Sequence, residues 1–284
     1  MDTKTRANNV GIRLKEIPIS EKFFEIDIAI KASLEAGNKI LEIYQNDFQT
    51  STKEDNSPIT EADIQSNEII KKNLSETEHH ILSEEDQDNE NRLDKETLWI
   101  IDPLDGTSDF IDKTGEFTIM IALIKNKKPV LGIINWPTEN TLFVAQIGKG
   151  AYRYSNENWN KIEVSNINEL KNCKVVGSRH HLSDKEKLFI RNLGVREFTS
   201  IGSSLKVGKI SSGEAEAYIT TTNKMKEWDT AASYCIIKEA GGKMTDIAGN
   251  EITYNNKDVY HKNGIIVSNG LIHKKIISEF KKLK

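Results

Sequence analysis

One stretch of the sequence, residues 98–107, constrains the fold and the chemistry more than any other. It contains Leu-Trp-Ile-Ile followed by Asp-Pro-Leu-Asp-Gly-Thr. The four apolar residues suit a strand buried on both faces, and Pro103 interrupts the regular ladder because it has no N–H group. Gly106 permits close backbone approach, and Thr107 can begin a helix. We therefore expect a strand end that presents Asp102, the Leu104 carbonyl and Asp105 to one place.

These groups together predict a site for a cation and a phosphate. Carboxylate and carbonyl oxygens are the ligands that hard cations prefer, and free N–H groups after a strand can hold phosphate oxygens. The alternative is an Asp-rich turn, because Asp, Pro and Gly are ordinary turn residues. An apolar strand that runs directly into this hexapeptide is much rarer than such a turn, so we favour the metal and phosphate site.

The composition bounds the class of protein. With 284 residues, 37% of them hydrophobic and 29% charged, the chain is typical of globular proteins. The net charge of −4 argues against a nucleic-acid partner, because it provides no basic field. Cys173 and Cys235 predict reduced, packed thiols, since they are far apart in the sequence. No apolar run approaches the length of a membrane span, and we expect a cytoplasmic protein.

Three further carboxylates occur where helices or strands are expected to begin or end. Glu84 follows the short segment 81–83 as Asp102 follows its own strand, so neighbouring strands would let them share a cation. Thr60 and Asp63 form a capping box before a helix, and capping is the more frequent role of such an aspartate. Asp229 fits the N-cap of the next predicted helix. From the residues alone, capping explains both aspartates.

Two polar clusters in the second half of the chain could bind an anion. Arg179 has a planar guanidinium that matches phosphate oxygens, while His180 and its neighbour His181 lack the spacing of a metal site. Ser203 and Lys206 lie at an expected helix start, where N–H groups and an ammonium suit an anion. The alternative is that Lys206 is a surface lysine and Arg179 a capping or salt-bridge residue.

The hexapeptide at 102–107, followed by Phe110, resembles the signature of the Mg²⁺-dependent, lithium-sensitive phosphatases of the inositol monophosphatase superfamily. Residues 115–124 are most similar to its 3′(2′),5′-bisphosphate nucleotidase (CysQ-type) branch, as are residues 202–206. Ser83, before the Glu-Glu pair, also favours that branch, and Trp-Asp-Thr-Ala-Ala at 228–232 is similar to the second signature of the superfamily. The resemblance extends from about Phe24 to the C-terminus.

The resemblance implies a role for each candidate residue. Glu84, Asp102 and the Leu104 carbonyl would hold one Mg²⁺ or Mn²⁺, and Asp102, Asp105 and Asp229 a second, with a weaker third ion at Glu84. Asp63 and Thr107 would orient the attacking water, with Glu84 as a further catalytic residue. The implied substrate contacts are Gly106, Thr107, Arg179, His180, Ser203, Lys206 and Asp229.

The resemblance also implies an α/β fold, a layered α-β-α-β sandwich of the inositol monophosphatase and fructose-1,6-bisphosphatase type. We expect an N-terminal extension (1–22), a metal-binding part (23–164) and a substrate-covering part (165–284) in one compact unit. The expected reaction is hydrolysis of 3′-phosphoadenosine 5′-phosphate to AMP and phosphate, by a monomer or homodimer. The alternatives are an inositol monophosphatase, a sugar bisphosphatase, or a non-catalytic phosphate-binding regulatory module.

Overall fold

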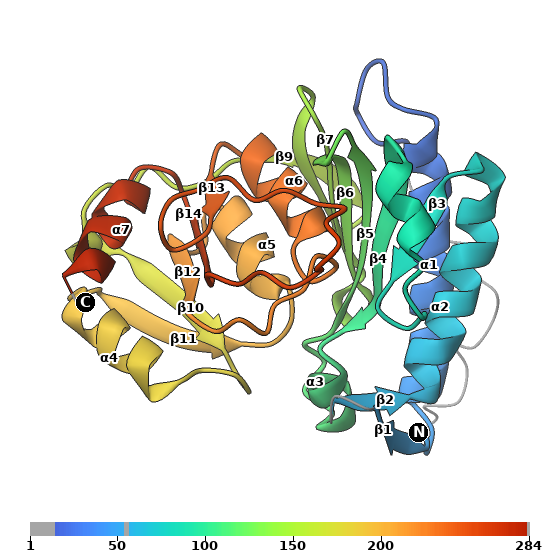
Figure 1. Ribbon diagram of the computed structural model, residues 1–284, viewed down its shortest axis with the longest axis horizontal. Coiled ribbons are helices and arrows are strands. Elements are labelled where there is room, and N and C mark those ends of the chain that lie inside the picture. Colours follow the sequence, from blue (N-terminus) through green and yellow to red (C-terminus); the bar gives the residue numbers. More distant parts are fainter. Residues whose placement is uncertain (1–14, 54–56, 283–284) are drawn as a thin grey trace.

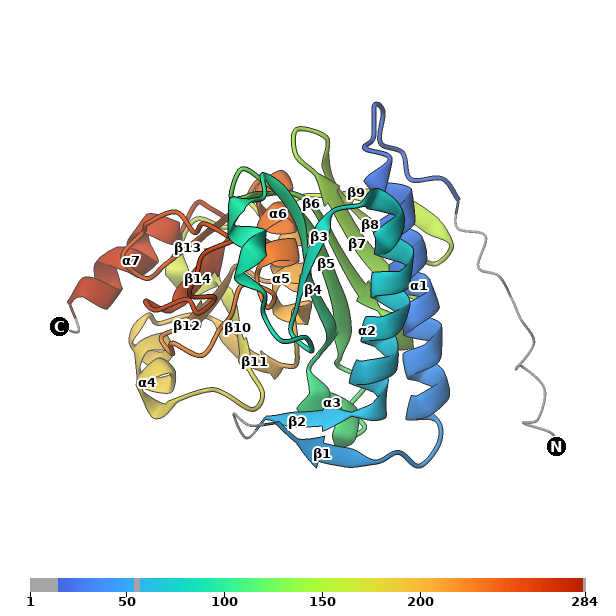
Figure 2. The same ribbon diagram turned by 45° about the vertical axis from the view of Figure 1, so that its right-hand side comes forward.

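Helices and sheets alternate in layers in the computed structural model, which describes residues 15–53 and 57–282 (Figure 1). The first layer consists of α1 (Glu25–Tyr44) and α2 (Glu61–Leu74), which lie side by side on a seven-stranded sheet (Figure 2). The strands follow one another in chain order: β3 (His80–Ser83), β4 (Thr97–Asp105), β5 (Thr118–Lys125), β6 (Lys128–Trp136), β7 (Thr141–Gln146), β8 (Gly150–Ser155) and β9 (Asn158–Ile162). β3 and β4 are parallel and all later pairs are antiparallel, so that β4 to β9 form a meander.

The second half of the chain forms the next layers. Helices α5 (Leu205–Ser211) and α6 (Ala231–Glu239) lie between the two sheets. A five-stranded sheet follows, in the order β11 (Glu197–Ile201), β10 (Lys174–Ser178), β12 (Ala217–Thr220), β14 (Ile265–Ser268) and β13 (Lys243–Thr245). Helices α4 (Asp184–Asn192) and α7 (His273–Lys281) cover its outer face. The predicted α-β-α-β order is confirmed, and these two helices add an outer layer.

Strand β4 is buried on both faces, as its sequence predicts. Leu98 and Ile100 belong to the core between the two sheets. Trp99 and Ile101 belong to the core beneath α1 and α2. Since side chains alternate along a strand, β4 is held by both layers, and its C-terminal end is a rigid place for functional groups.

The described part of the N-terminal extension packs against the molecule. Ile17 and Ile19 are buried in the core of the first half, and the carbonyl of Lys15 accepts a hydrogen bond from Trp159 Nε1 at 2.7 Å. Residues 15–22 therefore form an edge arm, with Lys15 at β9 and Glu21 at the end of β7, and they belong structurally with the first half of the chain. Residues 1–14 of the predicted extension lie outside the described residues.

Two short elements lie near the site. A hairpin of β1 (Thr50–Thr52) and β2 (Pro58–Thr60) leads into α2, and α3 (Thr107–Ile111) follows β4 at the same end of the molecule (Figure 1). Cys173 and Cys235 are buried free thiols, as predicted. Within residues 15–53 and 57–282, none of the helices has the length and apolar character that crossing a membrane requires.

Candidate active site

Three carboxylates meet at the C-terminal ends of β3 and β4. The parallel register pairs Ser83 with Ile101, and the Glu84 N–H continues it by donating to the Ile101 carbonyl at 3.2 Å. This register places Glu84 beside Asp102. Asp229 reaches the same place from the segment before α6, and carboxylate oxygens of the three residues lie within 4.8 Å of one another.

The electrostatics of this cluster favour a bound cation. Burial raises the pKa of Asp102 well above its ordinary value, and the charges of Glu84, Asp105 and Asp229 raise it further. Burial, and then the charge of Glu84, likewise raise the pKa of Asp229. Carboxylates that repel one another in this way are stabilised by a divalent ion. The all-oxygen donor set thus fits a hard metal ion.

The last part of β4, from Asp102 to Asp105, departs from the regular ladder and leads into a turn at Gly106. The pairing of β4 with β5 shifts register between Asp102 and Asp105, and the Leu104 N–H donates to Asp102 Oδ1 at 3.0 Å. Gly106 has φ of +95°, and a Cβ there would lie 3.2 Å from the Cβ of Ser203. The positive φ therefore favours glycine, and the nearby Glu116 carbonyl and Ser203 leave little room for a Cβ.

Asp105 joins the two halves of the molecule. Its Oδ2 accepts hydrogen bonds from the Ser204 N–H at 2.5 Å and from Thr118 Oγ1 at 3.4 Å. Asp105 lines the same pocket as the three clustered acids but lies outside their 4.8 Å group. The expectation of free N–H groups at the start of α5 is wrong for Ser204, because that amide binds a carboxylate of the protein itself.

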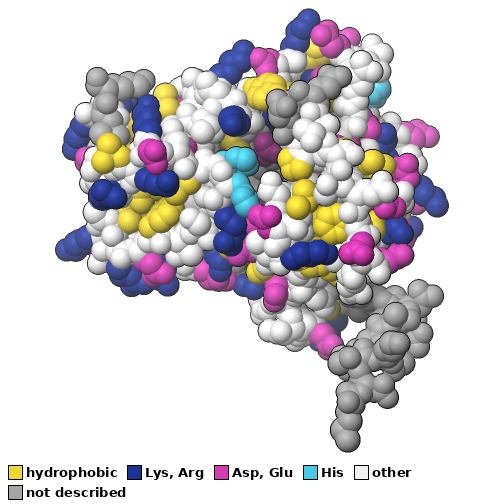
Figure 3. Space-filling model, turned by 90° about the horizontal axis from the view of Figure 1, so that it is seen from below, with side chains coloured by type: hydrophobic (Ala, Val, Ile, Leu, Met, Phe, Trp, Pro, Cys, Tyr) yellow, Lys and Arg dark blue, Asp and Glu magenta, His cyan; other side chains and the backbone are white. Residues whose placement is uncertain are grey.

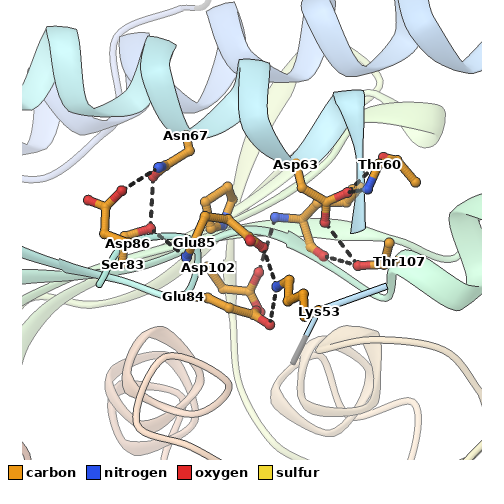
Figure 4. A network of polar contacts seen from close by, with 12 residues as sticks. Lys53, Thr60, Asp63, Asn67, Ser83, Glu84, Glu85, Asp86, Asp102 and Thr107 are labelled. Carbon is orange, nitrogen blue, oxygen red and sulfur yellow. Dashed lines mark hydrogen bonds and ion pairs between the residues drawn. The ribbon is translucent and has the colours of Figure 1, made fainter. Parts of the chain in front are cut away.

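Asp63 caps a helix and also contacts Thr107 (Figure 4). Its Oδ2 accepts the N–H and the hydroxyl of Thr60, both at 2.7 Å, and these bonds form the capping box of α2. Its Oδ1 accepts the hydroxyl of Thr107 at 3.0 Å. Burial raises the pKa of Asp63, whereas these hydrogen bonds oppose that rise. The Asp63 carboxylate therefore makes both of the contacts that the sequence suggested: Oδ2 caps α2, and Oδ1 contacts Thr107.

Lys53 is a component of the site that sequence reasoning missed. Its Nζ lies 2.9 Å from Glu84 and 2.6 Å from Glu85, between the two carboxylates (Figure 4). Burial opposes the charge on Lys53, but Glu84 and Glu85 outweigh it and raise the pKa of Lys53. Burial also raises the pKa of Glu85 to about 7, with the charge of Glu84 adding to it. No local pattern marks Lys53, because only the folded hairpin brings it to Glu84.

Lys206 lies buried in the pocket lining, as part of α5. Its Nζ donates to the Ser203 carbonyl and lies 5.3 Å from the centre of the Tyr218 ring. Burial lowers the pKa of Lys206, while the charges of Asp105 and Asp109 oppose this effect. The alternative of a surface helix lysine is wrong for Lys206.

Arg179 and His180 pair with acids of the first half. Arg179 Nε lies 3.1 Å from Asp109 and its Nη2 2.5 Å from Glu116, while His180 Nε2 lies 3.3 Å from Asp109. Glu116 also accepts the Gly202 N–H at 2.6 Å. These contacts support the alternative that Arg179 is a salt-bridge residue. A contact of Arg179 with the substrate remains a prediction.

One pocket gathers these groups between the two halves. It has an acidic wall formed by the clustered carboxylates and a side that we call cationic after Lys206 and Lys224, which His180 and His181 also line. Figure 3 views the molecule from below, and histidine side chains lie near the centre of this view, with lysine or arginine and acidic side chains beside them. Sequence reasoning missed Lys224, since an exposed lysine in a polar loop carries no signal of its own.

Comparisons with known proteins agree with this arrangement. The model of the inositol monophosphatase family, a metal-dependent family, matches residues 21–284. The 3′(2′),5′-bisphosphate nucleotidase CysQ of Escherichia coli (strain K12) is 34% identical over 248 residues, which cover 86% of this chain and 99% of that protein.

Solved structures show the same fold. The crystal structure of CysQ from Bacteroides thetaiotaomicron has a TM-score of 0.76 at 35% identity and covers 87% of this chain and 98% of that one. The IMPase of Thermotoga maritima has a TM-score of 0.78 at 26% identity, with 92% and 98% covered. The predicted resemblance and fold are confirmed: this chain belongs to the inositol monophosphatase family.

Proposed function

We propose that this chain is an Mg²⁺-dependent 3′(2′),5′-bisphosphate nucleotidase that hydrolyses 3′-phosphoadenosine 5′-phosphate to AMP and inorganic phosphate. The oxygen of a water forms a bond to the phosphorus as the bond from phosphorus to the ribose 3′ oxygen breaks, and one proton of the water goes to the ribose oxygen, which leaves as a hydroxyl. The observation that carries the proposal is the single pocket with an acidic wall for cations and a cationic side for a further phosphate. The curated relatives named as this nucleotidase support the choice of substrate.

The acidic wall would hold the metal ions. Glu84, Asp102 and Asp229 provide the clustered oxygens, with Asp105 and the Leu104 carbonyl beside them in the pocket lining. An all-oxygen set without histidine or cysteine favours Mg²⁺, or Mn²⁺, over Zn²⁺. When bound, such ions lower the pKa of a water and neutralise the charge that develops on the leaving oxygen.

Thr107 and Asp63 orient the attacking water in this proposal. When the Thr107 hydroxyl donates to Asp63, its oxygen keeps lone pairs that can accept a hydrogen bond from a water in the pocket and so orient it. The capping box holds the Asp63 carboxylate in place from the other side. The pair therefore supplies a positioned acceptor whose geometry does not depend on a flexible loop.

The substrate phosphates would contact the first turn of α3 and the cationic side of the pocket. Gly106 precedes α3 and Thr107 begins it, and both line the pocket, where their amides can hold the oxygens of the reacting phosphate. Ser203, His180 and Lys206 line the opposite side. Arg179 would act by holding Asp109 and Glu116, which are its ion-pair partners.

The test is phosphate release from 3′-phosphoadenosine 5′-phosphate and from inositol 1-phosphate, each with and without Mg²⁺. We expect release only with Mg²⁺, or with Mn²⁺, a higher kcat/KM for the nucleotide, and inhibition by Ca²⁺ and Li⁺. Calcium should inhibit because it accepts more ligands and looser geometry. Full activity in excess EDTA would contradict the metal requirement.

The second candidate function is an inositol monophosphatase. The TM-score of 0.78 with the Thermotoga maritima IMPase favours it, because the fold matches that enzyme as well as it matches CysQ. A higher kcat/KM on inositol 1-phosphate would select this alternative. No release from either phosphate, with the metal bound, would select a non-catalytic phosphate-binding module.

A further inference from the structure

The cations near the pocket differ in whether their charge is already balanced by the protein. Arg179 is paired with Asp109 and Glu116. Lys206 is buried, donates to the Ser203 carbonyl and feels the charges of Asp105 and Asp109. A cation that already has a carboxylate partner gains less from a phosphate, because it must lose that partner or share it.

Lys224 is different. It lines the same pocket from the loop between β12 and α6, and its side chain is exposed. Within residues 15–53 and 57–282 no ion pair or hydrogen bond of its ammonium group is found. Its positive charge is therefore available to a ligand.

The loop that carries Lys224 is held in place on both sides. After it, the Met225 carbonyl accepts the His261 N–H at 2.8 Å, and the Lys226 N–H donates to Asp229 Oδ2 at 2.6 Å. Before it, the Thr221 N–H donates to Glu186 Oε1 at 2.5 Å. Lys224 thus lies five residues before the clustered Asp229, on a segment that is anchored on both sides. It can therefore bind a charged group of a ligand at a set distance from the cluster.

His181 lies on the facing loop, after β10. Its N–H donates to Ser178 Oγ at 3.1 Å, which holds the start of that loop. Burial lowers the pKa of His181, and the nearby charges of Lys224, His180 and Lys206 lower it further, against the opposing charge of Asp109. The neutral His181 imidazole can donate a hydrogen bond to a phosphate beside Lys224, and it has no negative charge that would compete with the phosphate for the lysine ammonium.

We propose that Lys224, with His181 beside it, binds the phosphate of the substrate that is not hydrolysed, and that it sets the preference of this chain for bisphosphates. The inference rests on the proposed function, since it presupposes a substrate with two phosphates. It assigns the specificity to a loop lysine outside the metal cluster. Lys206 and Arg179, by contrast, have carboxylates of the protein around them.

The experiment compares Lys224→Gln with wild type on 3′-phosphoadenosine 5′-phosphate and on inositol 1-phosphate. We expect kcat/KM for the bisphosphate to fall about tenfold, as is usual for one charge-assisted contact, and kcat/KM for the monophosphate to stay unchanged. Lys224→Arg should restore most of the loss because it keeps the charge. The matched control is Lys125→Gln, which removes the same charge at the other end of β5 from the pocket.

Product inhibition provides a second measurement. The inhibition constant of AMP should rise about tenfold in Lys224→Gln, because AMP retains the second phosphate, whereas that of inorganic phosphate should not change. An equal loss on both substrates, or no loss on the bisphosphate, would overturn the assignment of Lys224. If wild type does not prefer the bisphosphate at all, the proposed function itself fails, and the two failures are thereby distinguished. Equal melting temperatures of variant and wild type will show that folding is intact.

Discussion

The two sides of the pocket are built in opposite ways. On the acidic side, Glu84 and Asp102 stand at the ends of neighbouring parallel strands, in a sheet that helices cover on both faces. On the cationic side, His181 and Lys224 stand on loops that leave β10 and β12. The acids crowd one another, whereas Lys224 has no partner in the described part of the chain.

This difference separates chemistry from specificity. Metal ions need ligands within a few tenths of an ångström of their places, and strand ends supply that rigidity for Glu84 and Asp102. Substrate preference needs only a charge at the right distance, and an anchored loop supplies it. Changes on the acidic side should therefore abolish activity on every substrate, and changes on the cationic side should alter the ranking of substrates.

The largest expected effect is that of Asp102→Asn. We expect kcat to fall by about a thousandfold or more on both phosphates, because the amide cannot balance a divalent charge. Without metal the same variant should melt at a higher temperature than wild type in EDTA. Since the folded-state pKa of Asp102 is raised, its contribution to stability is present at low pH and is lost as the pH rises through that pKa.

Melting curves in EDTA over a pH series, together with kcat in Mg²⁺, check this prediction. Asp86→Asn is the matched control, because Asp86 binds Asn67 and Lys71 outside the cluster. A lower melting temperature of Asp102→Asn in EDTA would show that the acids are not under mutual repulsion.

The next effect concerns the orienting pair on the same side. We expect Asp63→Asn and Thr107→Ala each to lower kcat by about a hundredfold, a magnitude usual for groups that position a proton acceptor. In Asp63→Asn the remaining oxygen can keep the cap of α2, while the new –NH₂ group faces the Thr107 hydroxyl and reverses that hydrogen bond. Stability should change little, and the double variant should be no worse than either single one. Additive losses would mean that the two residues act separately.

A smaller effect should distinguish Arg179 from Lys224. We expect Arg179→Ala to lower kcat/KM by about tenfold, and equally on mono- and bisphosphates, because it loosens Glu116 and hence the backbone at Gly202. Glu116→Gln should give a similar loss on both substrates. A loss confined to the bisphosphate would instead assign Arg179 to the second phosphate, as the sequence suggests.

The smallest effect lies outside both sides of the pocket. His273 is buried between Thr245 and Ser268, and burial lowers its pKa from 6.5 to about 4. The unfolded chain therefore takes up a proton first, and the stability contributed by neutral His273 is lost as the pH falls from 6.5 towards 4. His273→Gln should flatten this part of the melting-temperature profile, to which His261 also contributes, and leave kcat unchanged. An identical slope in variant and wild type would rule out His273 as its source.

Much of the acidic side was predictable because its signals are local. The apolar run, the proline and the glycine of residues 98–107 act on their own backbone, so strand, turn and helix follow from neighbours in the chain. The resemblance to a known family predicted the contact between Asp63 and Thr107, and the Thr60 and Asp63 pattern predicted the capping box. Both contacts are present because the Asp63 carboxylate has two oxygens, one for each partner.

The remaining features depend on segments that meet only in the folded chain. Lys53 contacts Glu84 from the β1–β2 hairpin, and Ser204 of the second half donates to Asp105 of the first. Arg179 forms its ion pairs with acids of the first half. The sequence determined which residues carry charge and where strands and helices begin. Only the tertiary structure decided which charges are already paired, because ion pairing depends on distance in space and not along the chain. That is the physical reason why Lys224, which has no such partner among the described residues, could be singled out from the structure alone.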